Sequence, residues 1–266
     1  MFNLIKMNLY RMTRAVSTWV LVIVIAAFGM LQFGTLKLMM DDPFNMFDGA
    51  GTALVGTETM TGTDTVSTFL QNSNILIIVS IFIVIFANAE QKCGFDKNII
   101  GITKHRWKHT LARWISAVIG MTALLIIGYF VMFALCALFL NSFTIGSVVA
   151  ILKSAGLMYI GMIAFSGLFF FFTTLFKSSA GGIVASLIVS LGILNLIEML
   201  LDLLTKKLIS NPRFVPSDFC LDNVVMSFKH ASAGTKTILG FVALCAVYLV
   251  LTIGGSMLLQ QRRDVK

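Results

Sequence analysis

The chain carries six apolar runs, each long enough to cross the hydrocarbon core of a membrane as a helix. The runs are Val16–Leu36, Phe69–Ala89, Leu111–Leu140, Ala155–Phe176, Ala180–Leu201 and Ile238–Leu259. Inside lipid every backbone N–H and C=O must be bonded within the protein, so runs of this length form helices. Charged residues make up 12% of the chain, against about 25% in a soluble domain. We therefore expect an all-α polytopic membrane protein, with six transmembrane helices in a single domain that covers residues 1–266.

Residues 1–14, which precede the first run, read MFNLIKMNLYRMTR. Phe2, Ile5, Leu9 and Met12 recur at helical spacing, and the basic residues lie elsewhere around the helix. This pattern is typical of a short amphipathic helix on a membrane surface. A cleaved signal peptide is the alternative, but the stretch is long for the charged part of a signal, and no clear cleavage site follows the first run. We expect an uncleaved interfacial helix.

The distribution of basic residues predicts the orientation in the membrane. With a cytoplasmic N-terminus, 13 of the 20 Lys and Arg residues lie in the cytoplasm and 7 lie outside. The first external loop is acidic, which agrees with this orientation. Both termini are then cytoplasmic, as an even number of spans requires. The net charge of +8 follows from this topology and gives no reason to expect a nucleic-acid partner.

No motif in the sequence predicts catalysis, a cofactor or a metal in this chain. The segment Ser232–Thr237 faintly resembles the end of a phosphate-binding loop, but its Gly and Lys are not adjacent and the earlier Gly is missing. His105 and His109 have a spacing that can hold a metal. Basic residues surround them and no Cys or carboxylate lies close in sequence, so we expect a basic cytoplasmic face. The four cysteines are far apart and are expected to be unpaired thiols.

Polar side chains stand at the outer end of the second run. Gln71, Asn72 and Asn74 lie directly before its strongly apolar part. Polar side chains at this depth face protein or water, so these three residues could form the wall of an external vestibule on a substrate path. The alternative is a loop that ends with residues capping the helix.

Three features of the fourth and fifth runs suggest structural roles. Glu198 lies about 27 Å along the fifth helix, near the outer boundary, where a carboxylate caps a helix or pairs with Lys206. Small residues recur every four positions in the fifth run, which allows close helix packing within or between subunits. They are Ser178, Gly182, Ser186 and Ser190. The crowded phenylalanines of the fourth run, from Phe165 to Phe176, are expected to face lipid.

The segment between the second and third runs carries the densest charge in the chain. Within it, Glu90, Gly94, Lys97, Ile99 and Ile100 form the pattern E-x-x-x-G-x-x-K-x-I-I. This pattern resembles the cytoplasmic coupling segment of ABC-2 type transporter permeases, and the layout of the whole chain is similar to theirs. The size of the chain and the lack of a fused ATPase resemble bacterial exporters of bacteriocins and of phenol-soluble-modulin-type peptides.

The resemblance implies that residues 90–110 receive force from an ATPase. Apolar side chains would form the contact, charges would fix its register, and Gly94 would allow the turn out of the second helix. A charged inner loop without this role is the alternative, but it does not explain the phenylalanine and the isoleucines. The residues expected to couple are Glu90, Gly94, Phe95, Lys97, Ile99, Ile100, Lys104 and Arg106.

The resemblance also implies partners. ATP and Mg²⁺ would be bound by two copies of a separate ATPase, and this chain would pair with a second permease chain, most simply a copy of itself. The cargo would be an amphipathic peptide or a lipid-like molecule, exported across the bacterial cytoplasmic membrane. Residues 202–237 would form an extracellular segment. The alternative is a membrane immunity or regulatory protein that binds a peptide without moving it.

Overall fold

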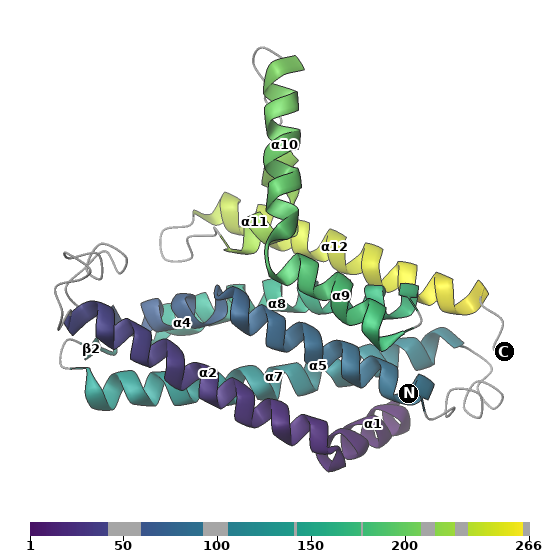
Figure 1. The fold of residues 1–266 in the computed structure, drawn as a ribbon, viewed down its shortest axis with the longest axis horizontal. Coiled ribbons are helices and arrows are strands. Elements are labelled where there is room, and N and C mark those ends of the chain that lie inside the picture. Colours follow the sequence, from purple (N-terminus) through teal and green to yellow (C-terminus); the bar gives the residue numbers. More distant parts are fainter. Residues whose placement is uncertain are drawn as a thin grey trace.

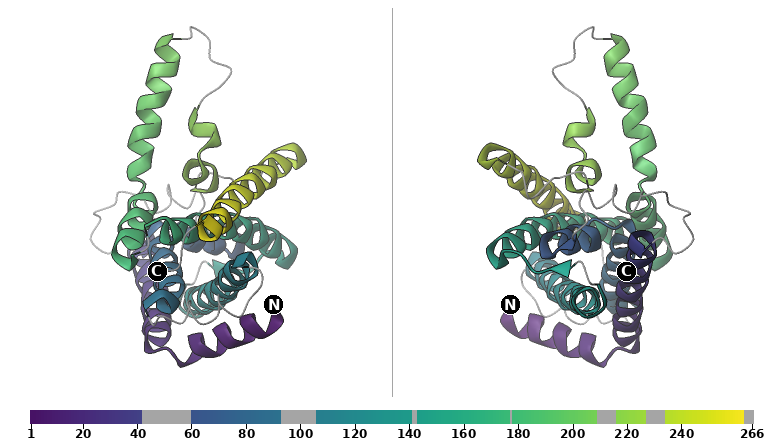
Figure 2. Two further views of the ribbon diagram at one scale, coloured as in Figure 1. Left: turned by 90° about the vertical axis from the view of Figure 1, so that its right-hand side faces the viewer. Right: turned by 90° about the vertical axis from the view of Figure 1, so that its left-hand side faces the viewer.

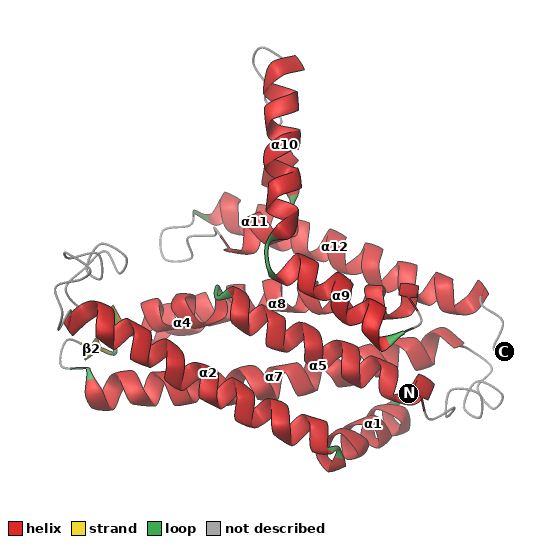
Figure 3. Cartoon of the chain, viewed as in Figure 1, coloured by secondary structure: helices red, strands yellow, loops and turns green. Residues whose placement is uncertain are grey.

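In the residues that it describes, the computed structural model of the chain consists of helices, turns and one pair of short strands (Figures 1 and 3). It describes residues 1–41, 60–92, 106–140, 143–176, 178–208, 216–226 and 234–262. The N-terminal half comprises α1 (Phe2–Arg14), α2 (Val16–Asp41), β1 (Met60–Thr61), α4 (Gly62–Leu70), α5 (Ser73–Lys92) and α7 (Arg106–Phe139). The C-terminal half comprises β2 (Phe143–Thr144), α8 (Val148–Phe176), α9 (Ser179–Ser190), α10 (Ile193–Leu208), the 3₁₀ helix η1 (Pro216–Phe219), α11 (Leu221–Met226) and α12 (Thr235–Arg262).

The lengths and apolar composition of these helices are those of a membrane protein. Four helices, α2, α7, α8 and α12, are each long and apolar enough to cross a bilayer. Two further pairs, α4 with α5 and α9 with α10, pass the same test only together, and each pair is bent by 55°. The described residues therefore contain four candidate spans, or up to six if each bent pair is one span. The expected all-α polytopic class is confirmed at this level.

The two bends differ from the unbroken spans that the sequence predicts, and local chemistry explains both. α4 begins with a capping box, in which the Thr61 hydroxyl and the Asp64 carboxylate each accept a backbone N–H of the other residue. It ends at Leu70, within the predicted second span, and two residues later the Asn72 side chain caps the start of α5, which separates the two helices. In the predicted fifth span, Gly192 adopts a φ of +70°, a backbone conformation that ends a helix and favours glycine. α10 therefore leaves the bundle in a new direction (Figures 1 and 2).

α8 occupies the centre of the bundle, where it contacts α4, α5, α7, α9, α11 and α12. Its phenylalanines do not all face lipid, so that prediction is wrong for three of them. Phe165, Phe169 and Phe170 are fully buried, whereas Phe176 is half exposed. The reason is position, because a helix with neighbours on most sides buries most of its circumference.

Small residues set the closest helix contacts. A Cβ on Gly29 of α2 would lie 2.9 Å from the backbone oxygen of Gly128 in α7, so α2 and α7 approach backbone to backbone there. Gly182, Ser186 and Ser190 of α9 are buried, and a Cβ on Gly182 would meet Val84 of α5 and Thr173 of α8. These three residues of the expected ladder therefore pack within one chain.

The bundle has two distinct ends (Figure 1). At one, which we call the terminal end, lie α1, the last residues of α5 and α12, and the first residues of α7. At the other, the strand end, β1 pairs in parallel with β2 through Met60 opposite Phe143 and Thr61 opposite Thr144. α10 projects away from the bundle, and many of its apolar side chains are exposed, including Leu196 and Met199.

Candidate functional site

The predicted coupling residues lie at the terminal end or outside the described residues. Glu90 belongs to the last turn of α5 and Arg106 begins α7, although the side chains of both are outside the description. The residues between these two helices are also outside it: Gly94, Phe95, Lys97, Ile99, Ile100 and Lys104. Their predicted role in coupling stays a prediction. α5 and α7, which flank this segment, pack against each other.

The first turns of α7 bury polar side chains where a basic cytoplasmic face was expected. Lys108 is exposed, and its ammonium group lies 5.6 Å from the centre of the Trp107 ring. His109 and Arg113, by contrast, are 1% and 0% exposed. The prediction of a basic face is therefore wrong for His109 and Arg113. α7 presents these two residues, four positions apart, to the interior of the bundle.

Polar contacts join this part of α7 to α8 and α12. The Arg113 guanidinium lies over the ring of Phe170 in α8, 5.3 Å from its centre, a cation–π geometry. One residue on, Trp114 donates its indole N–H to Ser166 Oγ in α8 at 3.2 Å. In addition, Thr110 donates to Gln260 of α12, and Thr174 of α8 donates to Ser256 of α12. We call the residues of these four contacts the polar layer.

The polar layer was not predicted from the sequence, although a signal for it exists. His109, Arg113, Ser116 and Gly120 follow one another at spacings of three or four residues. They continue into the buried apolar stripe of Met121 and Leu124. Polar and small residues in register with an apolar stripe indicate a buried face. The exposed basic residues nearby, such as Lys108, obscure that register in the sequence.

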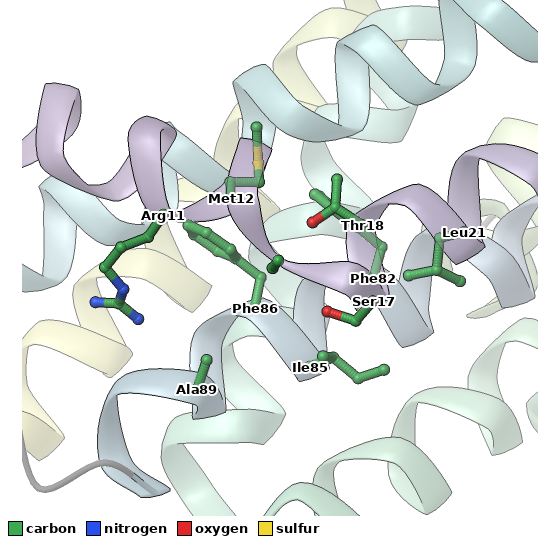
Figure 4. A pocket seen from close by; sticks show the side chains of 10 residues that line it. Arg11, Met12, Ser17, Thr18, Leu21, Phe82, Ile85, Phe86 and Ala89 are labelled. Carbon is green, nitrogen blue, oxygen red and sulfur yellow. The ribbon is translucent and has the colours of Figure 1, made fainter.

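α1 lies against α7 and encloses a small pocket with α2 and α5 (Figure 4). The pocket has a volume of about 90 Å³, and Phe82 and Phe86 of α5 stack along it with ring centres 6.2 Å apart. Arg11 and Met12 line it from α1. Sites for drug-sized ligands measure roughly 300–1,000 Å³, so this pocket is too small to hold a cargo peptide. It marks where α1 is anchored.

Gln71, Asn72 and Asn74 lie at the bend between α4 and α5. The Asn72 side-chain oxygen accepts the backbone N–H of Asn74 at 2.9 Å, and the Asn72 carbonyl accepts from Ile75 and Leu76. Asn72 is therefore the N-cap of α5, which confirms the capping alternative for this residue. Gln71 is half-buried and Asn74 is exposed. A role for the three residues in a substrate path stays a prediction.

No family model matches the sequence, and no curated protein or solved structure matches it. Within the described residues, no group of three or more His, Cys, Asp or Glu side chains could hold a metal ion.

A cluster of carboxylates lies where α10 meets η1 and α11. Glu198 of α10 and Asp222 of α11 are 8% and 7% exposed. Asp202 accepts the backbone N–H of Ser217 at 3.2 Å, and Tyr248 of α12 donates to the Phe219 carbonyl at 2.9 Å. The first bond joins α10 to η1, and the second joins η1 to α12. The partner expected for Glu198, Lys206, has its side chain outside the described residues.

The carboxylate cluster changes the protonation of its members. The pKa of the Asp222 carboxyl is raised to about 6, mainly by burial; a hydrogen bond from Asn195 opposes the rise and the nearby Glu198 adds to it. Burial also raises the pKa of the Cys220 thiol to about 12, helped by a hydrogen bond with Glu198 and by the nearby negative charges. Cys220 is thus a protonated, unreactive thiol at neutral pH.

Proposed function

We propose that this chain is the membrane subunit of an ABC exporter in the bacterial cytoplasmic membrane. In this proposal each bent helix pair is one span, which gives six spans, and α1 lies on the inner surface. Two copies of the chain work with two copies of a separate ATPase, which binds ATP and Mg²⁺. The cargo is an amphipathic peptide or a lipid-like molecule.

The observation that carries the proposal is the position of the two helix ends that flank the charged segment. The end of α5 and the start of α7 lie together at the terminal end, and the two helices pack against each other. From α7 the polar layer continues into α8 through Arg113 and into α12 through Thr110. A force applied to this segment would therefore reach three long helices through direct contacts.

The arrangement of the chain ends also supports the proposal. α1 and the last turn of α12 lie at the same end of the bundle as the end of α5 and the start of α7, which flank the charged segment (Figure 1). The cytoplasm contains the ATP, and the excess of Lys and Arg favours this end as cytoplasmic. An ATPase could therefore reach the segment between α5 and α7.

Co-purification tests the proposal most directly. The ATPase encoded beside this gene should co-purify with the wild-type chain in mild detergent. Ile99→Asp should weaken that binding, because it introduces a charge into an apolar contact, which costs several kcal/mol if the site is fully buried. Gly94→Val should keep binding but lower transport per ATP, because it strains the turn after α5.

The matched control is Ile145→Asp. Ile145 is 55% exposed and lies at the strand end, so the same change there should leave ATPase binding at the wild-type level. Transport and binding are compared at equal amounts of protein in the membrane. If Ile99→Asp binds the ATPase as well as Ile145→Asp does, the segment is only a charged loop. If no ATPase co-purifies with the wild type, the chain is better explained as a peptide-binding immunity or regulatory protein.

A further inference from the structure

An open groove lies between α4, α7 and α8 in the half of the bundle toward the strand end. Its volume is about 320 Å³, within the range of ligand sites. It is open on one side. Its lining residues include Thr122, Ile126 and Tyr129 of α7 and Leu152, Gly156 and Tyr159 of α8.

The lining carries no charge, and its hydroxyl groups are already bonded. The Thr122 hydroxyl donates to the Val118 carbonyl, so the Tyr159 hydroxyl, 2.6 Å away, donates to Thr122. In the same way the Thr65 hydroxyl donates to Gly62, and the Tyr129 hydroxyl lies 3.4 Å from Thr65. The surface left to a ligand is therefore almost entirely hydrocarbon and aromatic ring, which suits an alkyl chain and offers nothing to a polar group.

The open side of the groove faces outward from helices that can span a membrane. Ile126 of α7 is 62% exposed and Leu152 of α8 is 67% exposed, so the rim is apolar as well. α8 has 29 residues and is about 44 Å long, roughly 14 Å longer than a hydrocarbon core about 30 Å thick. With α8 centred in the membrane, Leu152 lies at the boundary of the core and Tyr159 about 10 Å inside it, within one leaflet. The groove is thus at the depth of lipid acyl chains.

A cation stands beside the groove at its shallow end. Lys153 is the single charged residue of α8, and its side chain is exposed. It lies three positions before Gly156, so the two are neighbours on the surface of the helix. A lysine here can extend its flexible stem toward the membrane surface and place the ammonium group at the level of lipid phosphates.

We propose that the groove binds a membrane phospholipid from the leaflet at the strand end, with one acyl chain in the groove and the phosphate at Lys153. The charge on the phosphate complements Lys153, and the uncharged lining complements the chain. The bilayer is as apolar as the groove, so leaving the bilayer for the groove gives the acyl chain no hydrophobic gain. The preference for the groove comes from the packing of the acyl chain against the lining and from the contact of the phosphate with Lys153. This site does not depend on the proposed transport function.

Substitutions of Gly156 test the proposal without disturbing the fold. Nothing lies within 4 Å of a Cβ added to it, so a larger side chain enters the groove without a clash. Native mass spectrometry of the full chain in mild detergent with added phosphatidylglycerol should detect one retained lipid on the wild type. Gly156→Phe should reduce it to background and Gly156→Ala should retain it. Lys153→Gln should weaken binding about fivefold, the effect of one lysine beside an anionic phosphate.

A second measurement uses the unaltered chain. Phosphatidylglycerol with a photoreactive group in its acyl chain should label residues 122–129 and 152–159 more strongly than Val247 and Val250 of α12. These two valines are exposed apolar positions that report lipid in general contact. Equal lipid retention by Gly156→Phe and Gly156→Ala, or equal labelling at α12, would overturn the proposal. The proposal would also be overturned if an amphipathic peptide displaced the lipid and Lys153→Gln had no effect, because the groove would then be a peptide site.

Discussion

At the residue scale, burial separates cations that look equivalent in the sequence. Arg113 and Lys108 lie in the same short basic stretch, yet Arg113 is fully buried over Phe170 and Lys108 is exposed. Removing a guanidinium from water is costly unless other groups compensate. The contact with an aromatic ring supplies part of that compensation, about 2 kcal/mol when both groups are desolvated. Arg113 joins α7 to α8 despite this cost, which agrees with the proposed role of the polar layer in transmitting force between the helices.

Asp222 leads to a prediction about pH. Its pKa is raised from 3.8 to about 6 in the folded chain, so the folded state holds the proton more tightly than the unfolded state does. The resulting stabilisation is absent above about pH 7, is gained as the pH falls through 6, and is complete only below 3.8. Its full size is up to about 3 kcal/mol, since each pKa unit corresponds to roughly 1.4 kcal/mol.

Asp222→Asn removes this titration and resembles the protonated carboxyl. The variant should melt at a higher temperature than the wild type at pH 7.5, and the difference should shrink at pH 5. The same change at the exposed neighbour Asp218 should not alter the pH dependence. A constant difference in melting temperature between Asp222→Asn and the wild type across this pH range would show that folding does not raise the pKa of Asp222.

At the element scale, the existence of the apolar helices was predictable and their geometry was not. Length and composition are enough to identify a helix that can span a membrane, as α2, α7, α8 and α12 illustrate. The bend at Gly192 depends on a single backbone conformation, which composition does not reveal. Likewise, the burial of Phe165 and Phe169 depends on the central position of α8, which is set by contacts with helices distant in sequence.

The candidate site was less predictable than the helices, for a related physical reason. The pattern from Glu90 to Ile100 marks a short segment, but it carries no information on which helices lie behind that segment. Arg113 contacts Phe170, Trp114 contacts Ser166 and Thr110 contacts Gln260 only when α7, α8 and α12 pack together. Contacts between residues 50 to 150 positions apart require the tertiary fold, so the polar layer appears only in the structure.

Two glycines of α2 test how closely the helices approach. A Cβ on Gly29 would lie 2.9 Å from the Gly128 carbonyl oxygen, which is backbone and cannot turn aside, whereas a Cβ on Gly34 would meet nothing within 4 Å. Gly29→Ala should therefore force α2 and α7 apart and destabilise the chain by roughly 1–3 kcal/mol. Gly34→Ala should be neutral or stabilise by up to about 1 kcal/mol, because alanine favours a helix over glycine. Equal thermal unfolding of the two variants would contradict the close contact.

At the scale of the whole molecule, the two ends of the bundle carry different chemistry. The terminal end contains both ends of the described chain and the helices that flank the charged segment (Figure 1). The strand end contains the β1–β2 pair, and the lipid groove lies in the half of the bundle beside it. This polarity agrees with the proposed division of labour, in which ATP-driven force enters at one side of the membrane and lipid or cargo is met toward the other. It also makes the orientation of the chain testable.

Single cysteines can determine that orientation. In a chain whose four native cysteines are replaced, Thr57→Cys and Thr235→Cys should react with a membrane-impermeant maleimide added to intact cells, and Lys104→Cys should react only after the cells are opened. The expectation rests on the 13 basic residues assigned to the cytoplasm against 7 outside, a bias that orients membrane helices during insertion. Labelling at Lys104 with protection at Thr57 would invert the topology and remove the coupling segment from the reach of an ATPase. Labelling at both Lys104 and Thr235 would instead make the number of spans between them even, and the bent pair α9 and α10, which lies between them with α7 and α8, would then enter and leave the membrane on one side.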